Sequence, residues 1–79
     1  MPNRLKVIHD EMHGVIKIKE NSQFNNVNAD QVIIDENITV RLFGSIKNIV
    51  LGKGSKLLLH GVVSGTVKNN GGEIHIFSK

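Results

Sequence analysis

The densest cluster of side chains that could do chemistry is His9-Asp10-Glu11-Met12-His13. On a helix, His9 and His13 would lie one turn apart and could bind zinc. The cluster lacks the H-E-x-x-H order of a zinc site, because Glu11 stands at the third position rather than the second. Gly14 follows at once, and strand-like segments flank the cluster. We interpret it as a solvated turn between strands and predict no metal site.

The other candidates for catalysis also have structural explanations. His60 and His75 have no serine, cysteine or carboxylate pattern nearby that suggests a nucleophile–base pair. The string Gly52-Lys53-Gly54-Ser55 lacks both the G-x-x-x-x-G-K-[ST] spacing and the following helix of a phosphate-binding loop. We predict that the protein is not an enzyme and needs no cofactor.

The second half of the chain repeats every 17 residues. Apolar residues, bulky rings and turn residues fall into columns when the sequence is shifted by this interval. The columns are Val40, Leu57 and Ile74; Leu42, Leu59 and Ile76; Ile33, Val50 and Val67; Phe43, His60 and Phe77; and Asn37, Gly54 and Gly71. Apolar columns indicate an inward face, and asparagine or glycine columns indicate bends, because these two residues adopt positive φ at least cost. The pattern predicts an all-β fold, a triangular parallel β-solenoid of about 17 residues per coil with coils about 4.8 Å apart.

An antiparallel fold is the alternative. Short strands with regular turns also build antiparallel barrels and sandwiches, and Asn69-Asn70-Gly71-Gly72 could form a hairpin turn. A meander of hairpins does not predict the same column identities at a constant offset. We therefore favour the solenoid.

We expect one domain over residues 1–79, because 79 residues are near the lower limit for a self-sufficient core. The regular coils span residues 32–77. The repeat weakens before residue 32, and residues 4–8 and 15–19 alternate like half-buried strands. We predict that residues 1–31 form irregular strands that cap the solenoid.

The repeat also predicts an apolar outer surface. If Ile33 and Val50 point inward, their neighbours on the strand point outward. The apolar neighbours are Val32, Ile34, Ile49 and Leu51. A contiguous apolar patch of this kind is typical of a contact surface, unless the N-terminal segment covers it. Leu58, between two inward leucines, is a second outward candidate on a different face.

The last strand is a third candidate interface. The chain stops at Lys79, and we expect nothing after Phe77 to cap the final coil. An open strand edge attracts another chain, so Glu73, His75 and Phe77 are the candidates here. We expect a homodimer, or a protein partner that adds a strand to this edge.

The composition limits the class of function. The chain has no cysteine, a net charge of +3 and no apolar run long enough to span a bilayer, so we expect a cytoplasmic protein without a membrane partner. Nucleic-acid binding usually needs clustered basic residues and exposed aromatic rings. Here the lysines scatter and there is no tyrosine or tryptophan. Weak nucleic-acid binding is therefore only a third hypothesis.

Residues 61–67 read G-x-V-x-G-x-V. This spacing of glycine and valine resembles the sequences of bactofilin-like proteins, and the resemblance covers roughly residues 32–77. Those are bacterial cytoskeletal proteins with a polymerising β-helix, so the resemblance implies a self-assembling scaffold. The small size and the lack of catalytic residues favour a different first hypothesis. It is a non-catalytic protein–protein interaction module, of the inhibitor or immunity type, that acts by occluding a partner's surface.

Overall fold

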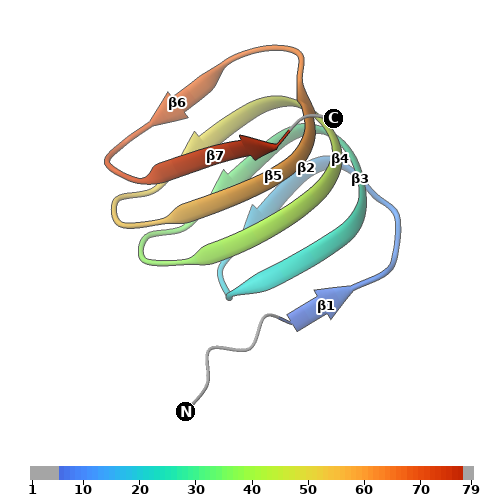
Figure 1. Ribbon diagram of the computed structural model, residues 1–79, viewed down its shortest axis with the longest axis horizontal. Helices are drawn as coiled ribbons and strands as arrows, with labels where there is room; N and C mark the ends of the chain where they lie inside the picture. The colour runs from blue at the N-terminus through green and yellow to red at the C-terminus, as the bar shows by residue number, and fades with distance from the viewer. Residues whose placement is uncertain (1–5, 78–79) are drawn as a thin grey trace.

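The computed structural model describes residues 6–77, which form strands and turns without a helix. The strands are β1 (Lys6–Ile8), β2 (Met12–Ile18), β3 (Ser22–Ile34), β4 (Thr39–Leu51), β5 (Lys56–Val63), β6 (Val67–Asn69) and β7 (Glu73–Phe77). Every strand pair in this range is parallel, and one continuous sheet winds through about four turns of about 17 residues (Figure 1). The predicted parallel β-solenoid is confirmed, and the antiparallel alternative is wrong.

Leucine and β-branched side chains fill the interior of the solenoid. Two of the predicted inward columns are present in β4 and β5, where Val40 pairs with Leu57 and Leu42 pairs with Leu59. All four side chains have no exposed surface. β-branched and leucine side chains fit this arrangement because alternate residues of a strand lie on opposite faces. The core is therefore a set of apolar columns that run from turn to turn.

The predicted outer patch is wrong, because its residues belong to this core. The side chains concerned are almost fully buried, and they are Val32, Ile34, Ile49 and Leu51. Ile33 and Val50, predicted to point inward, are only partly buried and lie on the outer side. The four buried residues cannot form a contact surface in the folded chain.

The bend at Asn48 explains the error. Ile46 and Ile49 are both buried although they are three residues apart. Strict alternation would have placed Val50, not Ile49, on the same face as Ile46. Two inward-facing residues on either side of the bend, Ile46 and Ile49, are separated by an odd number of positions. The alternation of inward and outward side chains is therefore reversed after the bend.

The N-terminal strands form the first turn of the solenoid rather than a separate cap. Lys6 pairs with Ser22, and Met12 pairs with Val27, so β1 and β2 lie parallel to β3 in the same sheet. The predicted irregularity is present as register shifts between Gly14 and Val15 and between Phe24 and Val27.

Bends occur where the sequence predicted them. Asn37, Gly54 and Gly71 have φ angles of 60°, 74° and 118°, which confirms their column as a turn. Another bend within β4 lies at Gly44, where φ is 141° and a Cβ atom would collide with the carbonyl oxygen of Val27 in the turn below. Glycine is required there because backbone, not a movable side chain, occupies the space.

Candidate protein interface

β7 forms a free edge at the C-terminal end of the described sheet. It pairs with β5 on one side, and no strand of residues 6–77 pairs with its other side. The amide N–H of Glu73 donates to the carbonyl oxygen of Ser55 at 2.8 Å. Because the N–H and C=O of a strand residue point to the same side, and successive residues alternate, Ile74 and Ile76 direct their backbone groups away from β5. Within residues 6–77 no backbone group pairs with them.

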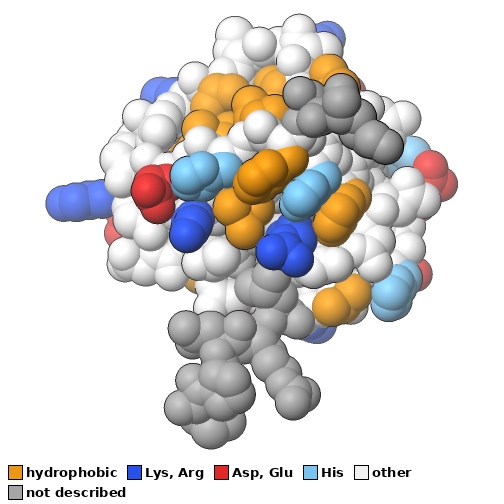
Figure 2. Space-filling view, viewed as in Figure 1, with side chains coloured by type: hydrophobic (Ala, Val, Ile, Leu, Met, Phe, Trp, Pro, Cys, Tyr) orange, Lys and Arg blue, Asp and Glu red, His pale blue; other side chains and the backbone are white. Residues whose placement is uncertain are grey.

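The inward side chains of this last turn are less covered than those below them. Leu59 is fully buried, whereas Ile76, its register partner in β7, is 50% exposed. On the other side of the turn Ile49 is buried, whereas its partner Val67 in β6 is 39% exposed. Figure 2 shows hydrophobic side chains gathered at this end of the molecule. The end of the solenoid is therefore an apolar surface bordered by backbone groups that have no partner among residues 6–77.

The outer side of β7 carries the three residues that the sequence proposed for this edge. Glu73, His75 and Phe77 are all exposed, and they alternate with the two isoleucines. Leu58 pairs with His75 in register and lies half-buried on the outer side of β5, as predicted. The structure thus brings these four candidates together on one face, apart from the four that lie in the core.

A stack of three rings supports this face. The ring centroids of Phe43 and His60 are 4.6 Å apart with planes inclined by 11°, and those of His60 and Phe77 are 4.7 Å apart with planes inclined by 17°. The predicted column of rings is confirmed. Both faces of the His60 ring are occupied, which gives this histidine a packing role and fixes the position of Phe77.

Replacing His60 with alanine is expected to lower the free energy of unfolding by about 1–2 kcal/mol, because two ring contacts are lost together. His60→Phe keeps the stack and is the matched control, with an expected change below about 0.5 kcal/mol. Urea unfolding followed by circular dichroism measures both. Equal losses in the two variants would contradict a stabilising role for the stack.

The N-terminal histidine cluster does not form a helix. His9 and Asp10 lie in the exposed connection between β1 and β2, while His13 is part of β2. His13 Nε2 is 3.5 Å from Glu11 Oε1, with both side chains more than half exposed. His9 Nδ1 lies 3.1 Å from the side-chain nitrogen of Asn25. In the part of the chain that the structure describes, no three histidine or carboxylate side chains converge in a way that could hold a metal ion.

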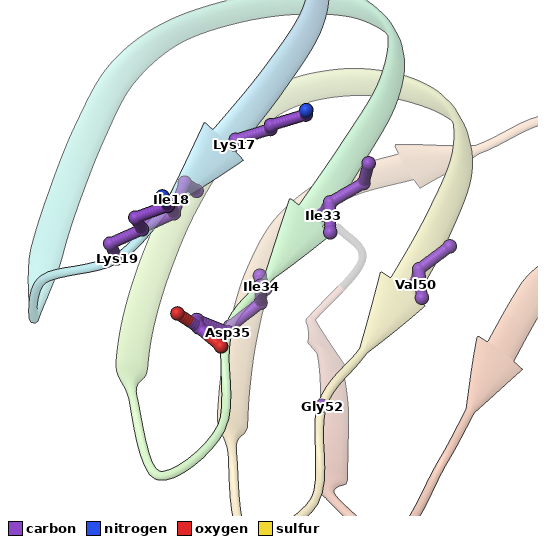
Figure 3. A pocket seen from close by; sticks show the side chains of 8 residues that line it. All are labelled: Lys17, Ile18, Lys19, Ile33, Ile34, Asp35, Val50 and Gly52. Atoms are coloured by element: carbon purple, nitrogen blue, oxygen red, sulfur yellow. The ribbon is translucent and has the colours of Figure 1, made fainter.

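An open groove of about 460 Å³ lies at the C-terminal ends of β2, β3 and β4. The side chains of Lys17, Ile33 and Val50 point to the same side there (Figure 3). Sequence reasoning missed this groove because it assigned Ile33 and Val50 to the interior. The groove is lined by lysine, isoleucine, valine, aspartate and glycine. That lining lacks the usual nucleophile–base pairs and offers apolar contact beside cationic side chains.

Comparisons with known proteins found no matching family model, no matching curated protein and no matching solved structure. Residues 6–77 contain no helix that is long and apolar enough to cross a membrane.

Proposed function

We propose that this chain is a non-catalytic protein-binding module that contacts its partner through the C-terminal turn of the solenoid. One observation carries the proposal: a half-exposed apolar surface lies directly beside the unpaired backbone of β7. Exposed apolar patches mark contact sites, and exposed strand edges pair with other chains. The two features at one place favour β-augmentation, in which backbone hydrogen bonds supply affinity and side chains supply specificity.

The proposed mode of action is occlusion, as in inhibitor and immunity-type proteins. A rigid end surface covers a partner's own functional surface without chemistry. Ile76 and Phe77 would be the central apolar contacts, because they are 50% and 48% exposed. Glu73 and His75 would lie beside them on the outer face.

The variant Ile76→Lys tests the surface. A lysine in the centre of an apolar contact must be desolvated, so we expect at least a tenfold loss of partner binding while the fold is kept. Val15→Lys is the matched control, since Val15 is 58% exposed and lies on β2 in the first turn. Tagged wild type and both variants are compared by crosslinking and mass spectrometry in lysate of the source cell. Circular dichroism and the urea midpoint verify that each variant is folded.

Recovery of the same partner in equal amounts by Ile76→Lys and by the wild type would refute this function. If only Val15→Lys lost the partner, the contact would lie on the first turn, at the opposite end of the solenoid.

A self-assembling scaffold is the second candidate. It is favoured by the first turn, where β1 and β2 pair only with β3 within the described range, so that each end of the sheet has a free edge. Stacking of turn on turn would then build filaments. Light scattering that rises steeply with concentration, together with filaments in electron micrographs, would favour this candidate over occlusion.

A further inference from the structure

We infer that the partner of the C-terminal edge is a second copy of this chain, paired antiparallel across a two-fold axis at His75 to give a closed dimer. The inference rests on the contact surface of the proposed function and names its partner. Because a second copy would occupy that surface, self-pairing replaces occlusion of another protein at this edge. It follows from the direction of the backbone groups, the pattern of side chains on β7 and the charges at the opposite end of the solenoid.

The backbone of β7 fits this pairing. The free N–H and C=O groups belong to Ile74 and Ile76, on either side of His75. In an antiparallel pair centred on His75, Ile74 of one copy lies opposite Ile76 of the other. The two residues then exchange hydrogen bonds in both directions, and the two His75 residues form the closely spaced pair without hydrogen bonds. A two-fold axis at Ile74 or Ile76 would pair only one isoleucine of each copy with an isoleucine, and the other would lie opposite a residue outside β7.

The side chains are also self-complementary. Since alternate residues share a face, Ile74 and Ile76 of one copy meet the same two residues of the other on the inner side, with no charge among them. The exposed inner surface of each last turn would then cover the other, and the two apolar cores would become continuous. On the outer side, Glu73 would lie opposite Phe77 and diagonal to His75.

The charges of the first turn disfavour continued stacking. Three lysines and one glutamate line a hollow of about 270 Å³ at that end, beside Ser22 and three apolar residues; the charged residues are Lys6, Lys17, Lys19 and Glu20. Two such ends facing each other would repel. A head-to-tail arrangement in the same register would extend the outer column that runs from Lys17 to Lys68, and would place Lys17 of the next copy beside Lys68. Pairing of the C-terminal ends avoids both contacts and closes the assembly at two chains.

A cysteine scan tests the axis directly, because the chain has no cysteine of its own. In the proposed dimer the Cα atoms of the two residues at position 75 are about 4.5 Å apart, which a disulfide can bridge. His75→Cys should therefore form a covalent dimer under mild oxidation. Glu73→Cys is the matched control on the same face of β7. Its two copies would be separated by about four residues along the strands, roughly 13 Å, which is too far for a disulfide.

Sedimentation equilibrium should show the wild-type chain at twice its 8.7 kDa mass, and Ile76→Lys at the mass of one chain. We expect His75→Cys to crosslink at least ten times faster than Glu73→Cys. Equal crosslinking rates would overturn the two-fold pairing, as would a wild-type chain that stays monomeric at all concentrations. The double variant Val7→Cys with His75→Cys tests head-to-tail stacking, and covalent ladders from it would also overturn the closed dimer.

The outcomes separate this inference from the proposed function. A monomeric wild type, together with an unrelated protein that is captured by the wild type and lost with Ile76→Lys, would reject self-pairing and keep the protein-binding function. A wild-type dimer that Ile76→Lys leaves intact would reject both the closed dimer and the C-terminal contact.

Discussion

Gly44→Ala is expected to destabilise the protein by about 4 kcal/mol, which is a large part of the stability of a typical domain. A Cβ atom at this position would collide with the carbonyl oxygen of Val27 in the turn below, and φ is 141°. Gly61 stacks on Gly44 equally closely, since a Cβ atom at Gly61 would collide with the carbonyl oxygen of Gly44. The sheet must separate locally before alanine fits.

Gly14→Ala is the control for this prediction. Gly14 has a φ of 74°, but no atom lies within 4 Å of the position that a Cβ atom would take, so only the backbone strain applies. That strain is about 1–2 kcal/mol. The free energies of unfolding of both variants are measured by urea titration. Similar losses in the two variants would show that close stacking of the turns at Gly44 is not the cause.

Leu51→Ala is expected to cost about 3 kcal/mol, whereas Val50→Ala next to it should cost less than about 1 kcal/mol. Leu51 has no exposed surface and lies in the core, while Val50 is only partly buried on the outer side. The alanine in the interior leaves a cavity that the surrounding turns cannot close. Outside, solvent replaces the lost methyl groups.

Urea unfolding of these two variants measures the difference directly. A larger loss for Val50→Ala than for Leu51→Ala would mean that the inward and outward assignments after Asn48 are reversed. Both variants should keep the association state of the wild type, because neither residue lies on the C-terminal turn.

The regular half of the fold was predictable where its columns repeat at 17 residues, as they do from β4 to β5 and from β5 to β7; β6 departs from this interval, since Val67 pairs with Ile49 and not with Val50. Leu57 and Leu59 pair with Val40 and Leu42 as the 17-residue shift predicts. The inward orientation of the Ile49 side chain was not predictable in the same way. One residue more or less in a bend exchanges inside and outside for the whole strand that follows, and residue type alone does not count the residues in a bend.

The first turn was hidden by irregular spacing. Met12 and Val27 are 15 residues apart, and Lys6 and Ser22 are 16 apart. Phe24 pairs with Leu42, at an interval of 18. A constant shift of 17 therefore misaligns residues that lie side by side, so the strand pattern was recognisable but its membership of the solenoid was not.

The C-terminal part of the candidate interface was predictable from local features. Glu73, His75 and Phe77 alternate with isoleucines in the last repeat, which fixes their side of the strand. Ile76 was not among the candidates because its column points inward. Its exposure depends on the neighbouring turn that would cover it, which is a property of the assembled coils and not of the strand.

The parallel pairing of β3 with β4 also has a consequence for how the chain folds. Each strand pairs with residues about one turn away, so no hairpin can form as a local starting point. A loop of roughly this length must close before the first ladder bond forms, which costs chain entropy. We expect β3 and β4, which share the longest ladder, to fold first and β6 and β7 to join afterwards. The surface proposed for binding would then be completed last, after the rest of the chain has become compact.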